Sequence, residues 1–113
     1  MLQKQYRLKK KKDFERVFKK GYYSPTPLWT LKWMRNELTH PRYGLVVSNN
    51  ISKSAVARNK IKRRLRSIVK KYQIVYPVDI VVITKLPILK SSFNEMDTVY
   101  AHQLKKIISL FEQ

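Results

Sequence analysis

The stretch between Glu37 and Asp79 contains no acidic residue, so its many basic side chains have no opposite charge nearby in the sequence. This excess of positive charge limits what the chain can fold into. Across its 113 residues the chain has 25 Lys and Arg but only 7 Asp and Glu, which gives a net charge of +18. Self-repulsion on that scale opposes a compact state unless a polyanion relieves it. The charge therefore predicts a domain that binds nucleic acid, with an anionic membrane surface as the other candidate polyanion.

Size and composition predict one small folded domain. Hydrophobic residues make up 43% of the chain, which allows a modest core and argues against wholesale disorder. A length of 113 residues suits a single domain, which we place over residues 1–113. Cysteine is absent from the sequence, and this excludes disulfides and thiolate zinc sites.

Neither a secretory signal nor a membrane span is expected. Residues 1–7 lack an apolar run after their charges. No stretch approaches the roughly 20 apolar residues that a helical span requires. We therefore expect a cytoplasmic protein that does not enter a membrane.

Residues 54–72 carry the strongest helical pattern. One apolar stripe, which core packing would explain, consists of Ile61, Leu65, Ile68, Val69 and Tyr72. The remaining surface is nearly all cationic: Arg58, Lys60, Lys62, Arg63, Arg64, Arg66, Lys70 and Lys71. A solvated helix face usually mixes signs, because like charges four residues apart destabilise a helix. Phosphate binding explains the one-sided charge, since Arg binds phosphate oxygens bidentately and Lys adds point charge.

The loop before this helix, residues 48–54, is polar and contains Lys53. Ser54 is placed to cap the helix. Backbone N–H groups at a helix start can hold a phosphate, and an ordinary capped loop explains the residues equally well.

Residues 13–21 predict a shorter helix. Asp13 is a candidate N-cap and Gly21 a candidate stop, while Phe14, Val17 and Phe18 share one face. Aromatic side chains can stack on unpaired bases, at about 1–3 kcal/mol per base. Aromatic residues at helical spacing also commonly form a core, and the pattern leaves both roles open for Phe14 and Phe18.

Two strands are expected between these helices. Residues 28–34 alternate, with Trp29, Leu31 and Trp33 on one face. Residues 43–48 form the second strand, antiparallel to the first if the polar turn at 36–41 closes a hairpin.

The last third of the chain predicts one strand and one helix. Residues 78–84 are β-branched and nearly continuous, as in a centrally buried strand, and residues 86–92 form a loop. An amphipathic helix of about four turns is marked by Met96, Val99, Tyr100, Leu104, Ile107, Ile108 and Phe111. The order of elements predicts an α+β sandwich, with helices packed on a small sheet.

Signals of side-chain catalysis are weak. His40 and His102 are isolated, and the seven acids are scattered along the chain. A protein metallonuclease needs clustered carboxylates to hold its metals. The only glycines, Gly21 and Gly44, make no phosphate-binding loop. We therefore expect no catalytic side chains and no metal bound by the protein alone.

Two sequence motifs stand out. The first is Arg7-Leu8-Lys9-Lys10-x-x-Asp13-Phe14-x-x-Val17-Phe18-x-x-Gly21. The second is Ala55-Val56-x-Arg58-Asn59-Lys60-Ile61-Lys62-Arg63-x-x-Arg66. The first resembles the amino-terminal signature of the bacterial ribonuclease P protein family, and the second resembles its arginine-rich motif. The resemblance extends over about residues 6–110, and the pairing of the two motifs in this order is specific.

The resemblance implies a fold of order α-β-β-β-α-β-α. Such a fold has about four strands and a left-handed crossover around the arginine-rich helix. The residue patterns indicate only two strands before that helix, so we expect the third within residues 43–51 or 29–35.

The resemblance also implies a function. The family binds one large catalytic RNA and helps it remove the 5′ leader from precursor tRNA. The RNA performs the chemistry with Mg²⁺ ions that it mainly holds itself, so the protein alone is expected to be inactive. One copy of the protein is expected in the cytoplasmic ribonucleoprotein.

Site residues follow from the two motifs. The implied contacts to the catalytic RNA are Arg58, Asn59, Lys60, Lys62, Arg63 and Arg66, to which we add Lys53 and Arg64. The implied leader-binding cleft contains Phe14, Phe18, Lys32 and Trp33. Lys60 occupies a position where the family has Arg, and the family's exposed strand aromatic falls on Lys32, next to Trp33.

Two other functions remain as alternatives. A ribosomal or other structural RNA-binding protein of similar fold would have the same charge, and only the motif pair argues against it. A basic protein of the membrane surface would need a helix with a wide, bulky apolar face. The apolar stripe in residues 54–72 has the size of a core-facing stripe instead.

Overall fold

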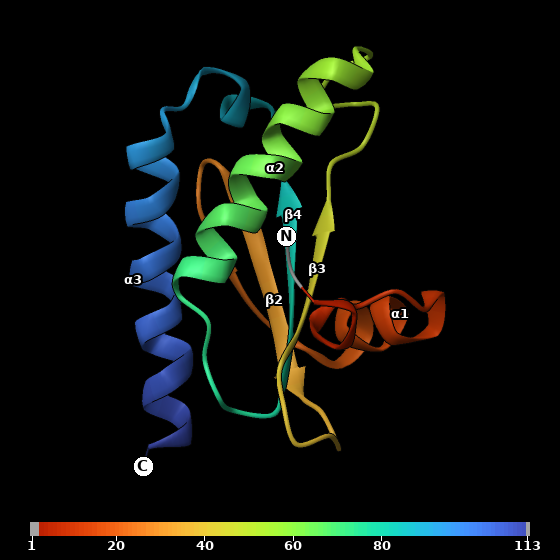
Figure 1. Ribbon diagram of the computed structural model, residues 1–113, viewed down its shortest axis with the longest axis vertical. Coiled ribbons are helices and arrows are strands. Elements are labelled where there is room, and N and C mark those ends of the chain that lie inside the picture. The colour runs from red at the N-terminus through yellow and green to blue at the C-terminus, as the bar shows by residue number, and fades with distance from the viewer. Residues whose placement is uncertain (1–2, 113) are drawn as a thin grey trace.

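The computed structural model describes residues 3–112 as a four-stranded sheet with helices packed on both of its faces (Figure 1). Its elements in chain order are η1 (Lys4–Tyr6), α1 (Lys11–Lys20), β1 (Tyr22–Pro25), β2 (Trp29–Arg35), β3 (Arg42–Val46), α2 (Ala55–Lys71), β4 (Val78–Thr84), η2 (Leu86–Lys90) and α3 (Phe93–Phe111). The α+β class and the order α-β-β-β-α-β-α are confirmed.

Strand β4 lies in the middle of the sheet, in the order β1-β2-β4-β3. Its Val82 pairs with Leu31 of the antiparallel β2 on one side and with Leu45 of the parallel β3 on the other. The predicted hairpin of residues 28–34 with residues 43–48 is therefore wrong. The central place goes to β4 because it is apolar towards both faces, and every residue in it except Ile83 is buried.

The third strand of the resemblance is β1, and both places predicted for it are wrong. β1 is an edge strand that pairs antiparallel with β2, from Tyr22 opposite Trp33 to Pro25 opposite Thr30. Its four residues are mostly exposed, so they show no alternation of apolar and polar side chains. The strand also contains Pro25, which an edge strand tolerates although proline is rare inside sheets.

The connection from β3 through α2 to β4 is left-handed, as the resemblance implied. In Figure 1 both strands point upwards, α2 lies in front of the sheet, and β4 lies to the left of β3. This crossover places the amino-terminal end of α2 beyond the carboxyl end of β3.

Helices α2 and α3 cover one face of the sheet and form the main core. The buried cluster includes Trp29, Leu31, Leu65, Ile68, Ile80, Val82, Met96 and Ile107. The indole N–H of Trp29 donates to Oε1 of Gln103 at 2.6 Å, and Nε2 of Gln103 donates to the carbonyl of Ser24 at 2.8 Å. The buried polar atoms of Trp29 and Gln103 are thereby paired, and these bonds link β1, β2 and α3.

Helices α2 and α3 both begin at a serine whose side chain caps the helix. The Ser54 hydroxyl accepts the Ala57 N–H at 3.2 Å and so caps α2, as predicted. Ser92 and Glu95 form a capping box at the start of α3. The predicted loop at 86–92 contains the short helix η2, and α3 extends over 19 residues, about five turns.

Helix α1 packs on the opposite face of the sheet. It begins one turn before the predicted N-cap, so that role of Asp13 is wrong: its carboxylate accepts a hydrogen bond from Arg42 at 3.2 Å. Gly21 ends the helix as predicted, and its N–H donates to the Val17 carbonyl at 2.9 Å. A Cβ at residue 21 would lie 2.5 Å from that carbonyl oxygen, so the close approach requires glycine.

Candidate nucleic-acid interface

The cationic face of α2 is largely free of acidic partners. Among residues 3–112, the one ion pair that α2 forms joins Lys71 to Asp97 at 2.9 Å. The apolar stripe is buried as predicted at Ile61, Leu65, Ile68 and Val69. Of the predicted RNA contacts, Asn59, Lys60, Arg63 and Arg66 are exposed, while Arg58, Lys62 and Arg64 are half-buried. The helix therefore presents concentrated positive charge to solvent.

Arg58 has a structural role at the start of α2. Its Nη1 donates to the carbonyl of Ser52 at 2.7 Å, and the Ser54 N–H donates to the Ser52 hydroxyl at 3.2 Å. These bonds order the loop that contains the exposed Lys53. Of the two interpretations of residues 48–54, the geometry favours a capped loop.

A depression of about 270 Å³ lies where the N-terminal segment, β3 and α2 meet. Its lining consists of Arg7, Leu8, Lys9, Phe14, Tyr43, Gly44, Leu45, Lys62 and Arg66. The segment is held to the sheet by the Leu8 N–H, which donates to the Tyr43 carbonyl at 2.8 Å. Cations from two separate segments therefore surround a partly apolar floor, an arrangement that suits a phosphate chain with a base beneath it.

Gly44 makes room for the aromatic part of this floor. A Cβ at residue 44 would lie 2.6 Å from Cε1 and 2.8 Å from Cζ of Phe14, so only glycine lets the ring lie this close to the strand. Phe14 is half-buried against the small cluster that includes Leu8 and Val17. It therefore belongs to the edge of a core and also lines the depression.

Phe18 continues the aromatic surface outwards. Its ring is 39% exposed, and its centroid lies 6.2 Å from that of Phe14. Lys32 of β2 lies beside it: the ammonium is 5.6 Å from the Phe18 ring centroid and donates to the Phe18 carbonyl at 3.2 Å. Phe14, Phe18 and Lys32 thus lie together on the α1 side of the sheet.

Trp33 does not join them. Its side chain is 9% exposed and lies in the core on the α2 and α3 side, with its ring centroid 5.7 Å from that of Tyr22. Successive residues of a strand point to opposite faces, so Lys32 and Trp33 cannot both line one cleft. Trp33 is therefore corrected from a cleft residue to a core residue.

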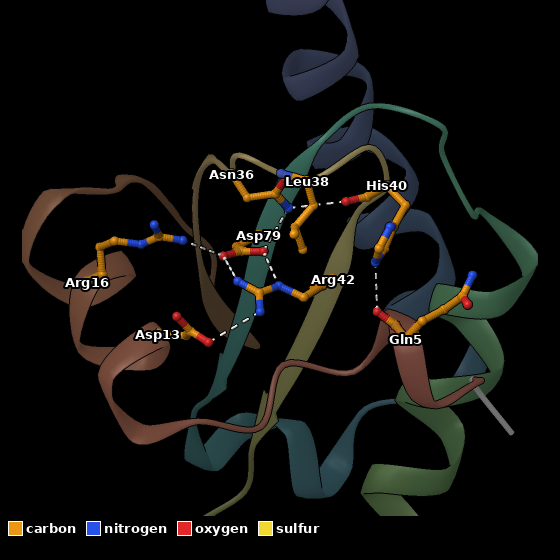
Figure 2. A network of polar contacts seen from close by, with 8 residues as sticks. All are labelled: Gln5, Asp13, Arg16, Asn36, Leu38, His40, Arg42 and Asp79. Carbon is orange, nitrogen blue, oxygen red and sulfur yellow. Dashed lines mark hydrogen bonds and ion pairs between the residues drawn. The ribbon is translucent and has the colours of Figure 1, made fainter.

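A buried carboxylate holds α1 in place on the sheet (Figure 2). Asp79 of β4 is wholly buried, and its Oδ2 accepts from Nη2 of Arg42 at 2.8 Å and from Nη2 of Arg16 at 3.0 Å. Its Oδ1 accepts from Nε of Arg42 at 2.9 Å and from Nδ2 of Asn36 at 2.9 Å. Since Arg16 lies on α1 and Arg42 on β3, the network joins three elements around one charge.

The same network raises the pKa of Arg42, chiefly through its hydrogen bonds to Asp79. Arg42 also donates from Nη1 to Asp13 on α1 at 3.2 Å, so it binds both carboxylates. Sequence reasoning missed this function of Asp79. The available signal was a single acid inside an otherwise apolar strand, which has to be paired when it is buried.

Other acids also have structural partners. Asp97 accepts hydrogen bonds from the Tyr72 hydroxyl and from Lys71, which lower its pKa in that order of importance.

Across residues 3–112, no three His, Asp or Glu side chains gather where they could hold a metal ion. Over the same residues, no helix is long and apolar enough to cross a membrane.

Known proteins are similar to this chain in both sequence and fold. The family model of ribonuclease P matches residues 2–108. A ribonuclease P protein component from Streptococcus pneumoniae is 36% identical over 106 residues, which cover 92% of this chain and 85% of the relative. The chain belongs to the ribonuclease P protein family.

Solved structures of ribonuclease P proteins have the same fold. The protein from Staphylococcus aureus is 35% identical with a TM-score of 0.80, over 90% of this chain and 94% of the other. The protein from Thermotoga maritima is 27% identical with a TM-score of 0.80, over 88% and 96%. Membership of the ribonuclease P family replaces the alternatives of a ribosomal protein and of a membrane-surface protein.

Proposed function

We propose that this chain is the RNA-binding subunit of ribonuclease P, which binds the catalytic RNA and the 5′ leader of precursor tRNA. The observation that carries the proposal is the continuity of two surfaces. Lys62 and Arg66 of α2 line the same depression as Phe14 of α1. RNA bound along α2 would therefore lie directly beside a surface on which the bases of an unpaired leader can stack.

The catalytic RNA binds along α2 in this proposal. Its phosphates meet the side chains of Lys53, Arg58, Asn59, Lys60, Lys62, Arg63, Arg64 and Arg66. Lys60 contributes positive charge, but unlike an arginine it cannot form two parallel hydrogen bonds to one phosphate. Arg58 also holds the Ser52 carbonyl, so it orders the loop as well as adding charge.

The leader binds as an unpaired strand over Phe14, Phe18 and Lys32. Aromatic rings bind single-stranded RNA by stacking and basic side chains bind its backbone, and both occur here within one surface. The network of Asp79, Arg42 and Arg16 positions α1, and therefore its two rings, over the sheet.

Cleavage is assigned to the RNA subunit. Mg²⁺ is held mainly by that RNA, and the protein raises affinity for the substrate by adding contacts to its leader. We propose that one protein copy acts in each ribonucleoprotein, in the cytoplasm.

The test is reconstitution from purified parts. Protein and ribonuclease P RNA are combined at low Mg²⁺, where we expect the protein to stimulate cleavage of precursor tRNA at the 5′ end of the mature sequence. The double variant Arg63→Glu/Arg66→Glu should lose this stimulation. The matched control is Lys105→Glu/Lys106→Glu, which makes the same charge change at exposed positions of α3 and should keep it.

Two outcomes would contradict the proposal. One is Mg²⁺-dependent cleavage by the protein without RNA, which a single acid substitution abolishes. The other is recovery of ribosomal RNA, and no ribonuclease P RNA, with the protein purified from cells.

A further inference from the structure

Strand β1 exposes two neighbouring tyrosines. Tyr22 is 67% exposed and Tyr23 is 68% exposed. Tyr22 pairs with Trp33, and its ring lies against the Trp33 ring on the α2 and α3 side of the sheet. Tyr23 pairs with Lys32 and points to the other face, because directly opposed residues of antiparallel strands share a face. Tyr22 and Tyr23 are therefore about equally exposed, but their side chains lie on opposite faces of the sheet.

Tyr23 lies in the same row across the sheet as the residues beside Phe14 and Phe18. Phe14 contacts Gly44 on β3, Phe18 lies against Lys32 on β2, and Tyr23 stands on β1. With the strands in the order β1-β2-β4-β3, this row crosses the whole sheet. Three strand spacings amount to about 14 Å, which accommodates several nucleotides of an unpaired strand.

The surroundings of Tyr23 favour RNA as its ligand. An exposed ring beside a lysine is the combination that single-stranded nucleic acid uses, with the base on the ring and the phosphate on the cation. Edge strands also bind extended peptides by strand addition. A net charge of +18 favours a polyanion over a peptide at this edge.

We propose that Tyr23, together with Lys32, forms a base-stacking subsite for single-stranded RNA at the β1 edge of the sheet. This subsite binds the leader nucleotide that follows the one stacked on Phe18. The inference rests on the proposed function, since it takes the leader as the RNA that crosses the cleft.

The experiment measures how tightly the reconstituted holoenzyme binds precursor tRNA and mature tRNA. Tyr23→Ala should weaken binding of the leader-bearing tRNA by about five- to 150-fold, the equivalent of about 1–3 kcal/mol, and leave mature tRNA unchanged. Tyr23→Phe should restore binding, because the ring is retained. The matched control is Tyr22→Ala, which removes an equally exposed tyrosine from the opposite face and should change binding less than twofold.

Shortening the leader locates the subsite. With nucleotides removed one by one from the 5′ end, the effect of Tyr23→Ala should vanish at a longer leader than the effect of Phe18→Ala. A leader carrying a single photoreactive uridine should crosslink to the β1 peptide only when that nucleotide lies beyond the one that crosslinks to α1.

The outcomes separate the two proposals. If the wild-type holoenzyme prefers leader-bearing tRNA and Phe18→Ala reduces that preference, but Tyr23→Ala does not, the Tyr23 subsite is wrong and the proposed function stands. If Tyr22→Ala matches Tyr23→Ala, the face assignment is wrong and the inference fails. If the wild-type holoenzyme shows no preference for the leader, both proposals fail.

Discussion

Arg42 binds the buried carboxylate of Asp79 through two parallel hydrogen bonds, from Nε to Oδ1 at 2.9 Å and from Nη2 to Oδ2 at 2.8 Å. The two residues are Cα register partners on β3 and β4, so the pair crosses the parallel half of the sheet. Arg16 reaches the same Oδ2 from α1 at 3.0 Å. Asp79 therefore links α1, which presents Phe14 and Phe18, to both β3 and β4.

Asp79→Asn should destabilise the fold by about 3 kcal/mol, since it leaves Arg42 without its buried counter-charge. Urea unfolding measures the loss. The control is Asp97→Asn, whose partner Lys71 is 58% exposed on its side chain, and it should have a much smaller effect at neutral pH. Equal losses for the two variants would show that Asp79 does not anchor α1.

Stability should also fall in acid because of Asp97. Hydrogen bonds from Tyr72 and Lys71 lower its pKa in the folded protein. A lowered pKa means that the stabilisation is complete above the unfolded value of about 3.9 and is lost as the pH falls through the folded value. Urea midpoints between pH 6 and pH 3 should therefore fall less steeply in Asp97→Asn than in the wild type. Parallel profiles would contradict this assignment.

Gly44→Ala should displace the Phe14 ring, because the new Cβ would lie 2.6 Å from it. Overpacking of this kind typically costs about 1–3 kcal/mol, which urea unfolding would reveal. The double variant Gly44→Ala/Phe14→Leu should be less destabilised than the sum of the single variants, since the smaller side chain removes the clash. Additive losses would mean that the alanine clashes elsewhere.

Phe18→Ala should weaken binding of leader-bearing tRNA while leaving the stability of the fold nearly unchanged, because its ring is 39% exposed. Phe14→Ala should affect both properties, as its ring is half-buried. Val17, on the same helix, is the control: it is wholly buried, so Val17→Ala should cost about 2 kcal/mol of stability without a leader-specific effect. Normal leader binding in both folded phenylalanine variants would place the leader elsewhere.

Arg66→Ala should reduce the dependence of RNA binding on salt. Each phosphate contact contributes about −0.7 to −0.9 to the slope of log K against log salt, so losing one contact flattens the slope by that amount. Arg58→Ala should flatten the slope too. It should also loosen the loop before α2, because Arg58 holds this loop through the Ser52 carbonyl. Lys106→Ala on α3 is the control and should leave the slope unchanged. A flattened slope for Lys106→Ala alone would place the RNA on α3.

Sequence patterns alone predicted the helices α1, α2 and α3, the strands β2, β3 and β4, and the family. The apolar stripe of α2 and its Ser54 cap were readable because helix periodicity and capping involve residues a few positions apart. β4 was recognisable as a central strand because it is apolar towards both faces. The amino-terminal motif followed by the arginine-rich motif was enough to indicate the ribonuclease P family.

The order of the strands could not be predicted from local sequence patterns. β4 enters between β2 and β3 although α2 separates it from both in sequence, and no local pattern encodes such a pairing. β1 was invisible because four mostly exposed residues show no alternation.

Which side chains lie on the α1 side of the sheet also depended on tertiary packing. The alternation of side chains along a strand predicts that Lys32 and Trp33 point to opposite faces of the sheet. Which of the two faces forms the main core depends on where α2 and α3 pack. The Asp79 network joins residues that are 37 and 63 positions apart, and its partners become visible only when the chain brings them together. Burial of a charge requires pairing, and the fold alone decides which cations are within reach.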